Sequence, residues 1–241
     1  MEKDMEMDIQ FPKKGKKLFK STNDYYTFSH FGWGDISSQF YGYIKGYKES
    51  ADKLVEFAVA SKRIDILDTY IFPILFLYRQ FIELSLKSLY LEYSDEPMAD
   101  KIQSIKQASH NLEAMWKKLK PILIEASNSK HEKDVVKTVE SYILQYHHFD
   151  KGSFKFRYPI DKDFNPLLQG EERIDIVNLK ECMTELDNFF GGADGKLDFL
   201  KECKYEQEQY LREVEAEMKA EFEAEMRAEY EAEMRSYIDW D

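Results

Sequence analysis

The sequence predicts an all-α protein, an antiparallel helical bundle with an aromatic N-terminal segment, a short hairpin-like insertion and a long C-terminal helix. Apolar residues recur at helical spacing in several segments joined by short links. Near the C-terminus an eight-residue word begins at Ala216, returns at Ala224 and recurs in degraded form from Ala232. Its Ala, Glu, Met, Lys and Arg residues are strong helix formers. The expected parts are an aromatic segment 1–47, a bundle 48–192 and an acidic helical arm 193–241.

Length and composition bound the classes of protein to which the chain can belong. The 241 residues are 43% hydrophobic and include 16 Tyr and 17 Phe, enough for one folded core and an appendage. The net charge of −12 is uneven, because residues 205–241 hold 13 acidic and 4 basic side chains. Such a tail repels nucleic acid and anionic lipid at long range. The basic run at 13–17 is expected to be a solvated arm, with nucleic-acid contact as the alternative.

Cysteine content and hydropathy give an expectation for the cellular compartment. The two cysteines, Cys182 and Cys203, are too few for a disulfide framework and fit a reducing cytosol. The acidic N-terminus lacks the apolar run of a signal peptide. The longest apolar run, residues 71–78, is too short to span a bilayer. We therefore expect a cytoplasmic protein without a membrane partner.

Residues 21–47 are rich in aromatic rings and contain four glycines. Because so many rings are unfavourable in water, we expect this segment to wrap over the body and to pack its rings on helices. A ligand pocket lined by these rings is the alternative. The next segment, 48–61, is predicted to be an amphipathic helix, since Leu54, Val55 and Ala58 have helical spacing.

The most apolar predicted helix covers residues 65–93. Its apolar residues occupy most of the circumference, as in a helix that is buried on several sides. Pro73 lies inside this pattern and is expected to begin or kink the helix. Two further helices are predicted over 110–126, with Ser109 as the N-cap, and over 131–149.

The helical pattern breaks after residue 150. Residues 154–158 alternate rings with cations, which predicts a short extended segment with three rings inward and two charges outward. A helix is then predicted over 174–190, with Gly191-Gly192 as its stop signal. The final helix is expected to begin near Asp194 and to continue toward the C-terminus.

The final helix carries a large apolar residue at every fourth position, at Met218, Phe222, Met226, Tyr230 and Met234. Each step of four residues turns the helix about 40° too far to stay on one face, so the stripe winds and forms no heptad seam. One interpretation is a charged, solvated helix. The other is a helix that docks on a partner protein or on a second copy, because Met-rich surfaces are adaptable.

Five polar residues in apolar settings are candidates for a functional site. Arg79 and Glu83 lie one turn apart on the most buried helix. Either Glu83 orients Arg79 toward an anion, or the two form a charged seam facing solvent or an internal ion pair. His110 lies at a predicted helix start, which favours the neutral imidazole and a role as a base, unless it only caps the helix. Arg157 could point into a cleft with Asp150. The candidate catalytic residues are Arg79, His110 and Arg157, supported by Glu83 and Asp150.

The chain contains no familiar catalytic or cofactor motif. A Gly-rich phosphate loop, His-Glu-x-x-His, Cys-x-x-Cys and Gly-x-Ser-x-Gly are all missing from the sequence, which argues against a nucleotidase, a zinc hydrolase and a serine hydrolase. His147, His148 and Asp150 offer metal-binding atoms, but adjacent histidines cannot share one helix face. We expect no metal and no cofactor.

Three short words in the sequence carry a resemblance to a known family. They are Tyr-Arg-x-x-Ile-Glu-Leu-x-Leu-Lys at 78–87, His-Asn-Leu-x-x-x-Trp at 110–116 and Phe-x-Phe-Arg-Tyr-Pro at 154–159. Over roughly residues 50–190 the chain resembles HEPN-like proteins, the "higher eukaryotes and prokaryotes nucleotide-binding" helical domains. The resemblance implies an up-and-down bundle that often dimerises. Many members are metal-independent endoribonucleases of bacterial toxin–antitoxin and anti-phage systems, marked by an Arg followed after four to six residues by a His. No Arg of this chain has such a His.

Three functions remain as hypotheses. A non-catalytic relative would be a binding or assembly module of a prokaryotic defence or toxin-type system, recognising a nucleotide, RNA or a protein. A catalytic relative would be an endoribonuclease with a site rebuilt from Arg79, His110 and Arg157, in which His110 moves a proton at a 2′-hydroxyl. The acidic arm could also imitate a phosphate backbone, as a nucleic-acid mimic does. We favour the binding or assembly module.

Overall fold

The computed structural model describes residues 10–168, 170 and 173–238 and divides at Gln39/Phe40 into two compact units. Within these residues all regular secondary structure is helical, which confirms the predicted fold class. The helices are α1 (Ile36–Ser61), α2 (Ile64–Tyr93), α3 (Met98–Ala108), α4 (Leu112–Glu125), α5 (Lys130–Phe149) and α6 (Ile176–Ile238). None of these six helices is long and apolar enough to cross a membrane.

The N-terminal unit has little regular structure before α1 begins. The rings of Tyr25 and Phe28 meet edge-to-face, with centroids 5.8 Å apart. The predicted wrapping of residues 21–47 over the body stays a prediction for 21–39, whereas residues 40–47 belong to helix α1. The predicted start of the first helix at residue 48 is wrong, because α1 begins at Ile36, where the side chain of Asp35 accepts a hydrogen bond from the Ser38 amide at 2.8 Å.

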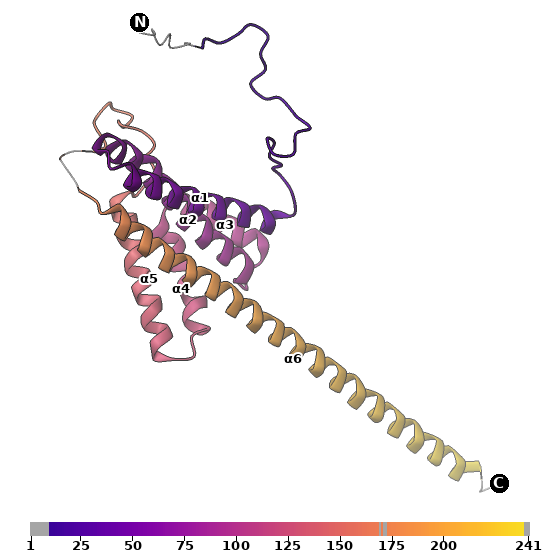
Figure 1. Ribbon diagram of the computed structural model, residues 1–241. Coiled ribbons are helices and arrows are strands. Elements are labelled where there is room, and N and C mark those ends of the chain that lie inside the picture. The colour runs from indigo at the N-terminus through magenta and orange to yellow at the C-terminus, as the bar shows by residue number, and fades with distance from the viewer. Residues whose placement is uncertain (1–9, 169, 171–172, 239–241) are drawn as a thin grey trace, which may run out of the picture. The chain divides into compact units, whose positions relative to one another are not determined.

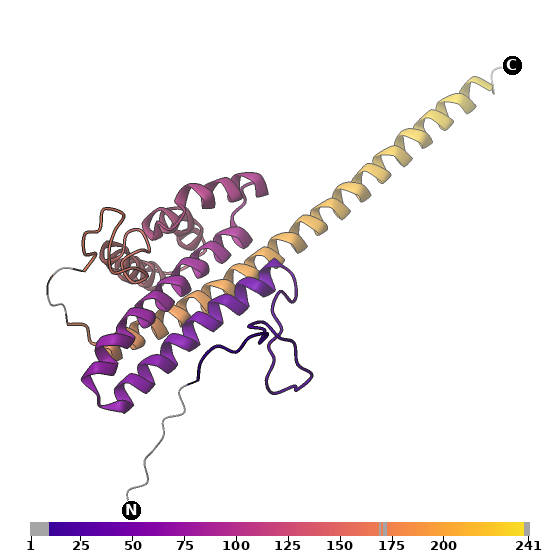
Figure 2. The ribbon, with the colours of Figure 1, turned by 90° about the horizontal axis from the view of Figure 1, so that it is seen from above.

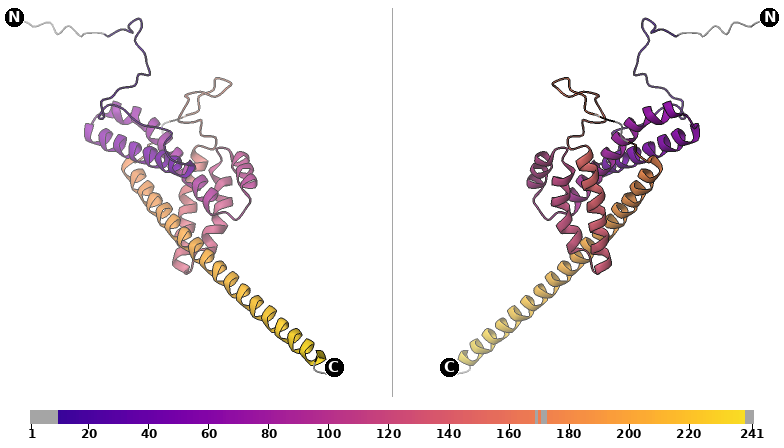
Figure 3. Two further views of the ribbon diagram at one scale, coloured as in Figure 1. Left: turned by 90° about the vertical axis from the view of Figure 1, so that its right-hand side faces the viewer. Right: turned by 90° about the vertical axis from the view of Figure 1, so that its left-hand side faces the viewer.

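The most extensive packing of the bundle joins α4 to α2 and to α5, and side-chain contacts link α1 to α2. In the α1–α2 pair, the Tyr78 hydroxyl donates to Asp52 at 2.7 Å, and Phe57 stacks on Tyr70. In the α4–α5 pair, visible in Figure 3, Trp116 donates to Glu140 at 3.1 Å. Helix α2 also contacts α3, α4 and α6. The prediction that residues 65–93 form the most buried helix is therefore confirmed.

The structure has one continuous helix, α6, where the sequence predicted two. Gly191-Gly192 does not end it and Asp194 does not begin a new one, so the predicted boundary at 192/193 falls inside a helix. The physical reason is packing, since Phe190 and Leu197 on either side are buried in the core, which outweighs a cost of about 1 kcal/mol for each glycine.

The first part of α6 packs on the bundle, and the rest leaves it. Early in α6, Lys180 donates to Glu56 of α1 at 2.7 Å, and the two helices lie side by side in Figure 2. In the part of α6 that the structure describes, the last ion pair with the bundle joins Lys204 to Asp95 at 3.8 Å. Beyond that point α6 continues past the other helices of its unit (Figure 1).

The predicted N-cap at the α3–α4 link is wrong, and helix α3 was not predicted. Ser109 ends α3 with a positive φ of 49° and does not cap the next helix. Asn111 provides that cap, because its side chain accepts from the Ala114 amide at 2.9 Å.

The segment 154–158 is a turn, so the predicted extended conformation is also wrong. The amides of Arg157 and Tyr158 both donate to the carbonyl of Phe154, and the Asp150 carboxylate accepts from the Phe154 amide at 3.1 Å. Only the ring of Phe156 is buried, whereas Phe154 is 49% exposed and Tyr158 54% exposed. The hairpin-like character of the insertion is limited, within the described residues, to a single bridge between Ile160 and Pro166.

Candidate functional site

Four charged or titratable side chains meet where α2 approaches the start of α4. We call Arg79, Glu83, Lys87 and His110 the α2 cluster. The three α2 residues lie one turn apart on one face. Glu83 accepts from Arg79 Nη1 at 3.1 Å and from Lys87 Nζ at 2.6 Å. His110 arrives from the α3–α4 link, with its Nδ1 3.0 Å from Glu83 Oε1. The structure therefore brings together the predicted residues Arg79, Glu83 and His110.

Arg79 is the buried member of the α2 cluster and holds two of its other members in place. Its side chain has no exposed surface, and its two Nη groups donate to the Glu83 carboxylate and to the His110 carbonyl. Burial lowers the pKa of Arg79, but a guanidinium titrates so far above neutrality that it stays charged. Direct contact with a substrate anion, the role that the sequence suggested, does not fit a group with no surface.

Glu83 remains ionised in spite of its burial. Burial alone would raise the pKa of Glu83, whereas Lys87, Arg79 and His110 lower it, and together they hold the pKa below its usual range. The carboxylate is thus a buried anion surrounded by cations and donors. Such an anion fixes the orientation of whatever hydrogen-bonds to it.

His110 is the member of the α2 cluster that a ligand can reach, since its side chain is 45% exposed. A carboxylate only accepts hydrogen bonds, so a neutral His110 carries its proton on the Nδ1 that faces Glu83. The other ring nitrogen, Nε2, then has a free lone pair and can take a proton from a bound molecule. A carboxylate that orients an imidazole in this way is a common arrangement in general-base catalysis.

Arg157 and Asp150 shape the turn after α5, and among the described residues neither forms a hydrogen bond or ion pair with the α2 cluster, although the charge of Asp150 acts on Arg79. Asp150 is buried and bonds the backbone of the turn. Arg157 is exposed, donates to the Ser153 carbonyl and lies over the Phe154 ring, 4.9 Å from its centroid. The nearest connection is indirect: Gln80, next to Arg79 on α2, donates to the Ser153 hydroxyl at 3.2 Å. Within the described residues no hydrogen bond or ion pair joins Arg157 to the α2 cluster.

His147 was considered from sequence only as a metal ligand. It is 5% exposed, and its Nε2 lies 3.6 Å from a Glu113 carboxylate oxygen. Its Nδ1 is buried, with no hydrogen-bond partner among the described residues. A single histidine within an apolar stripe gives no sequence signal that separates this burial from ordinary core packing.

The burial of His147 predicts a loss of stability in mild acid. Burial lowers the pKa of His147, so the folded protein keeps the imidazole neutral while the unfolded chain takes up a proton near 6.5. The stabilising contribution is complete above the unfolded pKa and is lost as the pH falls through the lower folded pKa. We expect the melting temperature to fall between about pH 7.5 and 5.5, and to fall less in His147→Gln. The exposed neighbour provides the control, as His148→Gln should keep the wild-type slope; equal slopes in all three proteins would contradict the prediction.

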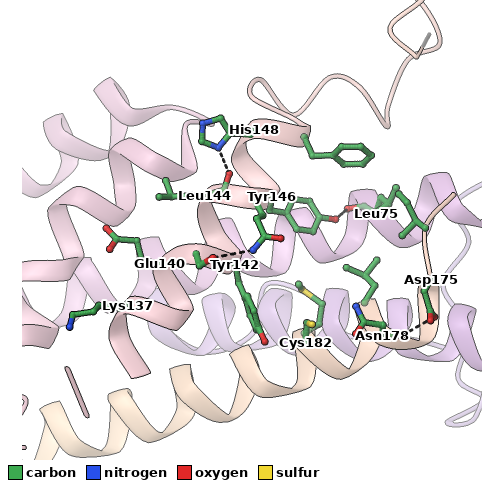
Figure 4. Close-up of a pocket in the computed structure, with 16 residues that line it drawn as sticks. Leu75, Lys137, Glu140, Tyr142, Leu144, Tyr146, His148, Asp175, Asn178 and Cys182 are labelled. Atoms are coloured by element: carbon green, nitrogen blue, oxygen red, sulfur yellow. Dashed lines mark hydrogen bonds between the residues drawn. The ribbon is translucent and has the colours of Figure 1, made fainter. Parts of the chain in front are cut away.

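A groove of about 1010 Å³ lies between α5 and the start of α6, and no residue of the α2 cluster lines it. Figure 4 shows Tyr142 and Tyr146 entering it from α5, and Asn178 and Cys182 from α6. A hydrogen bond to Glu185 and burial raise the pKa of Tyr142 to about 12, and burial raises the pKa of Tyr146 above its usual value. Both phenols therefore stay protonated near neutral pH. The groove can hold an apolar group, and the exposed imidazole of His148 lies at its edge, with Nδ1 2.6 Å from the Leu144 carbonyl. Unlike the ring of His110, this ring has no carboxylate partner among the described residues.

No metal site is evident in residues 10–168, 170 and 173–238, since no three His, Cys, Asp or Glu side chains there are arranged to hold an ion. His147, His148 and Asp150 have separate contacts, with Glu113, the Leu144 carbonyl and the 154–155 amides. The chemistry that the site can perform is thus proton transfer by His110. None of the known protein families, curated proteins or solved structures compared with the chain is similar to it.

Proposed function

We propose that the protein is a binding and assembly module of the HEPN-like type, with a helical body and a C-terminal arm that engages a protein partner. The observation that carries the proposal is the exposure of the C-terminal part of α6. From here on, the arm means residues 205–238 of α6, a shorter segment than the arm 193–241 predicted from sequence. It makes no hydrogen bond or ion pair with the bundle among the described residues, since the last such pair is at Lys204. Its large apolar side chains are exposed, for example Phe222 at 63% and Met218 at 65%.

An exposed apolar stripe on a separate helix is unfavourable unless something covers it. Soluble proteins seldom expose contiguous apolar surface, and where they do, it marks an interaction site. A helix that offers apolar anchors at spacings of three and four residues fits the groove or helix surface of another protein. These considerations favour a module that recruits a partner over a self-contained enzyme.

Removal of the arm tests this function. We expect the full chain to retain a protein partner in a pull-down from source cells, or to show a multiple of its monomer mass in light scattering. The chain shortened to residues 1–204 should neither retain a partner nor self-associate. Its bundle should still show a helical circular dichroism spectrum and the melting temperature of the full chain. Absence of any partner and of self-association from the full chain, or the same behaviour in both chains, contradicts the proposal.

One observation favours a second candidate function, a metal-independent endoribonuclease. It is the contact of the partly exposed His110 with the buried Glu83 at 3.0 Å. In this candidate Nε2 of His110 removes the proton of a ribose 2′-hydroxyl as that oxygen attacks the adjacent phosphate. The role of Arg79 is to hold Glu83 and the His110 backbone, and the phosphate must be met by other groups.

His110→Ala tests the endoribonuclease on a mixed-sequence RNA. We expect the rate of cleavage to fall by at least about 100-fold, because a positioned proton acceptor contributes that much or more. His131→Ala, which replaces an exposed histidine at the start of α5, serves as the matched control and should cleave like the wild type. Undiminished cleavage by His110→Ala, with its fold verified by circular dichroism, rules the site out, and a wild type that leaves the RNA intact rules the function out.

A further inference from the structure

The part of the arm nearest the bundle carries one coherent face. At about 100° per residue its members fall within about 120° of the circumference. We call it the arm face, and its apolar members are Leu211, Val214, Met218, Phe222 and Met226. The stripe winds off this face only at Tyr230 and Met234. The arm face thus extends over about four turns, or about 22 Å, which is the length of a typical helix-binding site.

Carboxylates lie within the arm face, among its apolar side chains. Glu215 and Glu225 project within about 40° of the centre of the face, and Glu229 continues along its centre one turn further on. In the described residues none of these three forms an ion pair or a side-chain hydrogen bond. The surrounding tail is acidic throughout, with 13 acidic against 4 basic residues from 205 to 241.

We propose that the arm face docks a basic amphipathic helix of a partner protein. This inference rests on the proposed function and names the chemistry of the partner. Leucine-like side chains of such a helix would cover Met218, Phe222 and Met226, while its Lys or Arg side chains reach the carboxylates beside them. Methionine suits this role, because its flexible thioether adapts to the shape of the opposing side chains.

A second copy of the chain fits this face poorly. In a parallel pair of arms, each Glu225 would face the Glu225 of the other copy. In an antiparallel pair centred near residue 220, Glu215 of one copy would face Glu225 of the other. Both arrangements bring unpaired carboxylates together on an apolar seam, where like charges repel most strongly. A basic partner turns the same carboxylates into attractive contacts.

The experiment titrates the full chain against a labelled 18-residue peptide of Leu and Lys, with its leucines spaced to form one helical face. Fluorescence anisotropy reports the affinity. We expect saturable binding that weakens as salt rises, because exposed charges are screened. A peptide of the same composition in scrambled order should bind at least about tenfold more weakly, and a peptide of Leu and Glu should not bind.

Two triple variants separate the apolar face from general charge. Met218→Glu/Phe222→Glu/Met226→Glu should weaken binding by at least about tenfold. Ala216→Glu/Ala220→Glu/Ala224→Glu adds the same charge on the opposite side of the helix and should bind as tightly as the wild type or more tightly. Both variants keep strong helix formers, so circular dichroism should be unchanged.

Equal affinities of the two variants, or equal affinities of the ordered and scrambled peptides, would overturn the inference. So would a dimer in light scattering that the Met218→Glu/Phe222→Glu/Met226→Glu variant converts to a monomer. That last outcome leaves the proposed assembly function standing, with a second copy as the partner. Failure of the assembly function itself is distinct, since the shortened chain 1–204 would then behave like the full chain.

Discussion

Glu83→Ala should lower the free energy of unfolding by about 3–5 kcal/mol, because removal of one member of a buried ion pair leaves the other uncompensated. Arg79 has no exposed surface and cannot turn to water. Its remaining acceptor is a single carbonyl, that of His110. The measurement is urea denaturation followed by circular dichroism. A loss of this size would also lower the melting temperature by roughly 2–4 °C per kcal/mol.

Two further variants give this experiment its controls. Glu49→Ala removes an acid of similar helical placement whose ion pair with Lys45 is largely exposed, and it should change the stability by about 0.5 kcal/mol or less. Glu83→Gln keeps an oxygen acceptor in place, so its loss should lie between the two. If Glu83→Ala costs no more than Glu49→Ala, the α2 cluster does not hold the bundle together.

The bundle could be predicted from sequence wherever burial follows helical spacing. The expected helix 65–93 corresponds to α2, and 131–149 to α5, each within one residue at its ends. In both, large apolar residues repeat on the buried face, so the pattern carries the information directly.

The helix that the sequence did not reveal, α3, lacks such a pattern. Its most buried residues are Lys101, Ser104 and Ala108, and two of these are polar. Lys101 is buried because its ammonium donates to the Leu91 carbonyl at the end of α2 at 2.8 Å. A backbone acceptor on another helix has no signature in the sequence. The continuation of α6 through Gly191-Gly192 was hidden for a similar reason, since packing on either side and not local propensity decides it.

The same distinction explains which parts of the site were predictable. The spacing of Arg79 and Glu83 on one helix face allowed an ion pair between them as one interpretation, and the structure adds Lys87 to it. His110 was predicted to lie at a helix start and was grouped with Arg79 only in the endoribonuclease hypothesis. Its actual contacts have no signal in the sequence: its ring meets the Glu83 carboxylate, and its carbonyl accepts from Arg79. Arg157 was misplaced because Asp150 folds the segment 154–158 into a turn, and alternating rings do not reveal a side chain that caps backbone amides.

Trp116→Ala should destabilise the bundle by about 3–5 kcal/mol, the usual cost of removing a fully buried tryptophan. Trp116 is among the largest side chains with no exposed surface, and it fills the space where α4 packs on α2 and α5. The loss should be seen as a lower urea midpoint in circular dichroism. Trp33→Ala is the control, because Trp33 is 51% exposed in the N-terminal unit, and its removal should cost about 0.5 kcal/mol or less.

The cause of the Trp116 loss can be separated from that of the Glu83 loss. Trp116 donates to Glu140, but Lys120 also donates to both oxygens of that carboxylate at 2.8 Å. Removing the indole therefore leaves no unpaired charge, and we expect the cost to come chiefly from lost packing. Trp116→Phe, which refills most of the cavity without the N–H, should recover most of the stability. A variant with phenylalanine as unstable as the one with alanine would show that the hydrogen bond to Glu140, and not packing, holds α4 against α5.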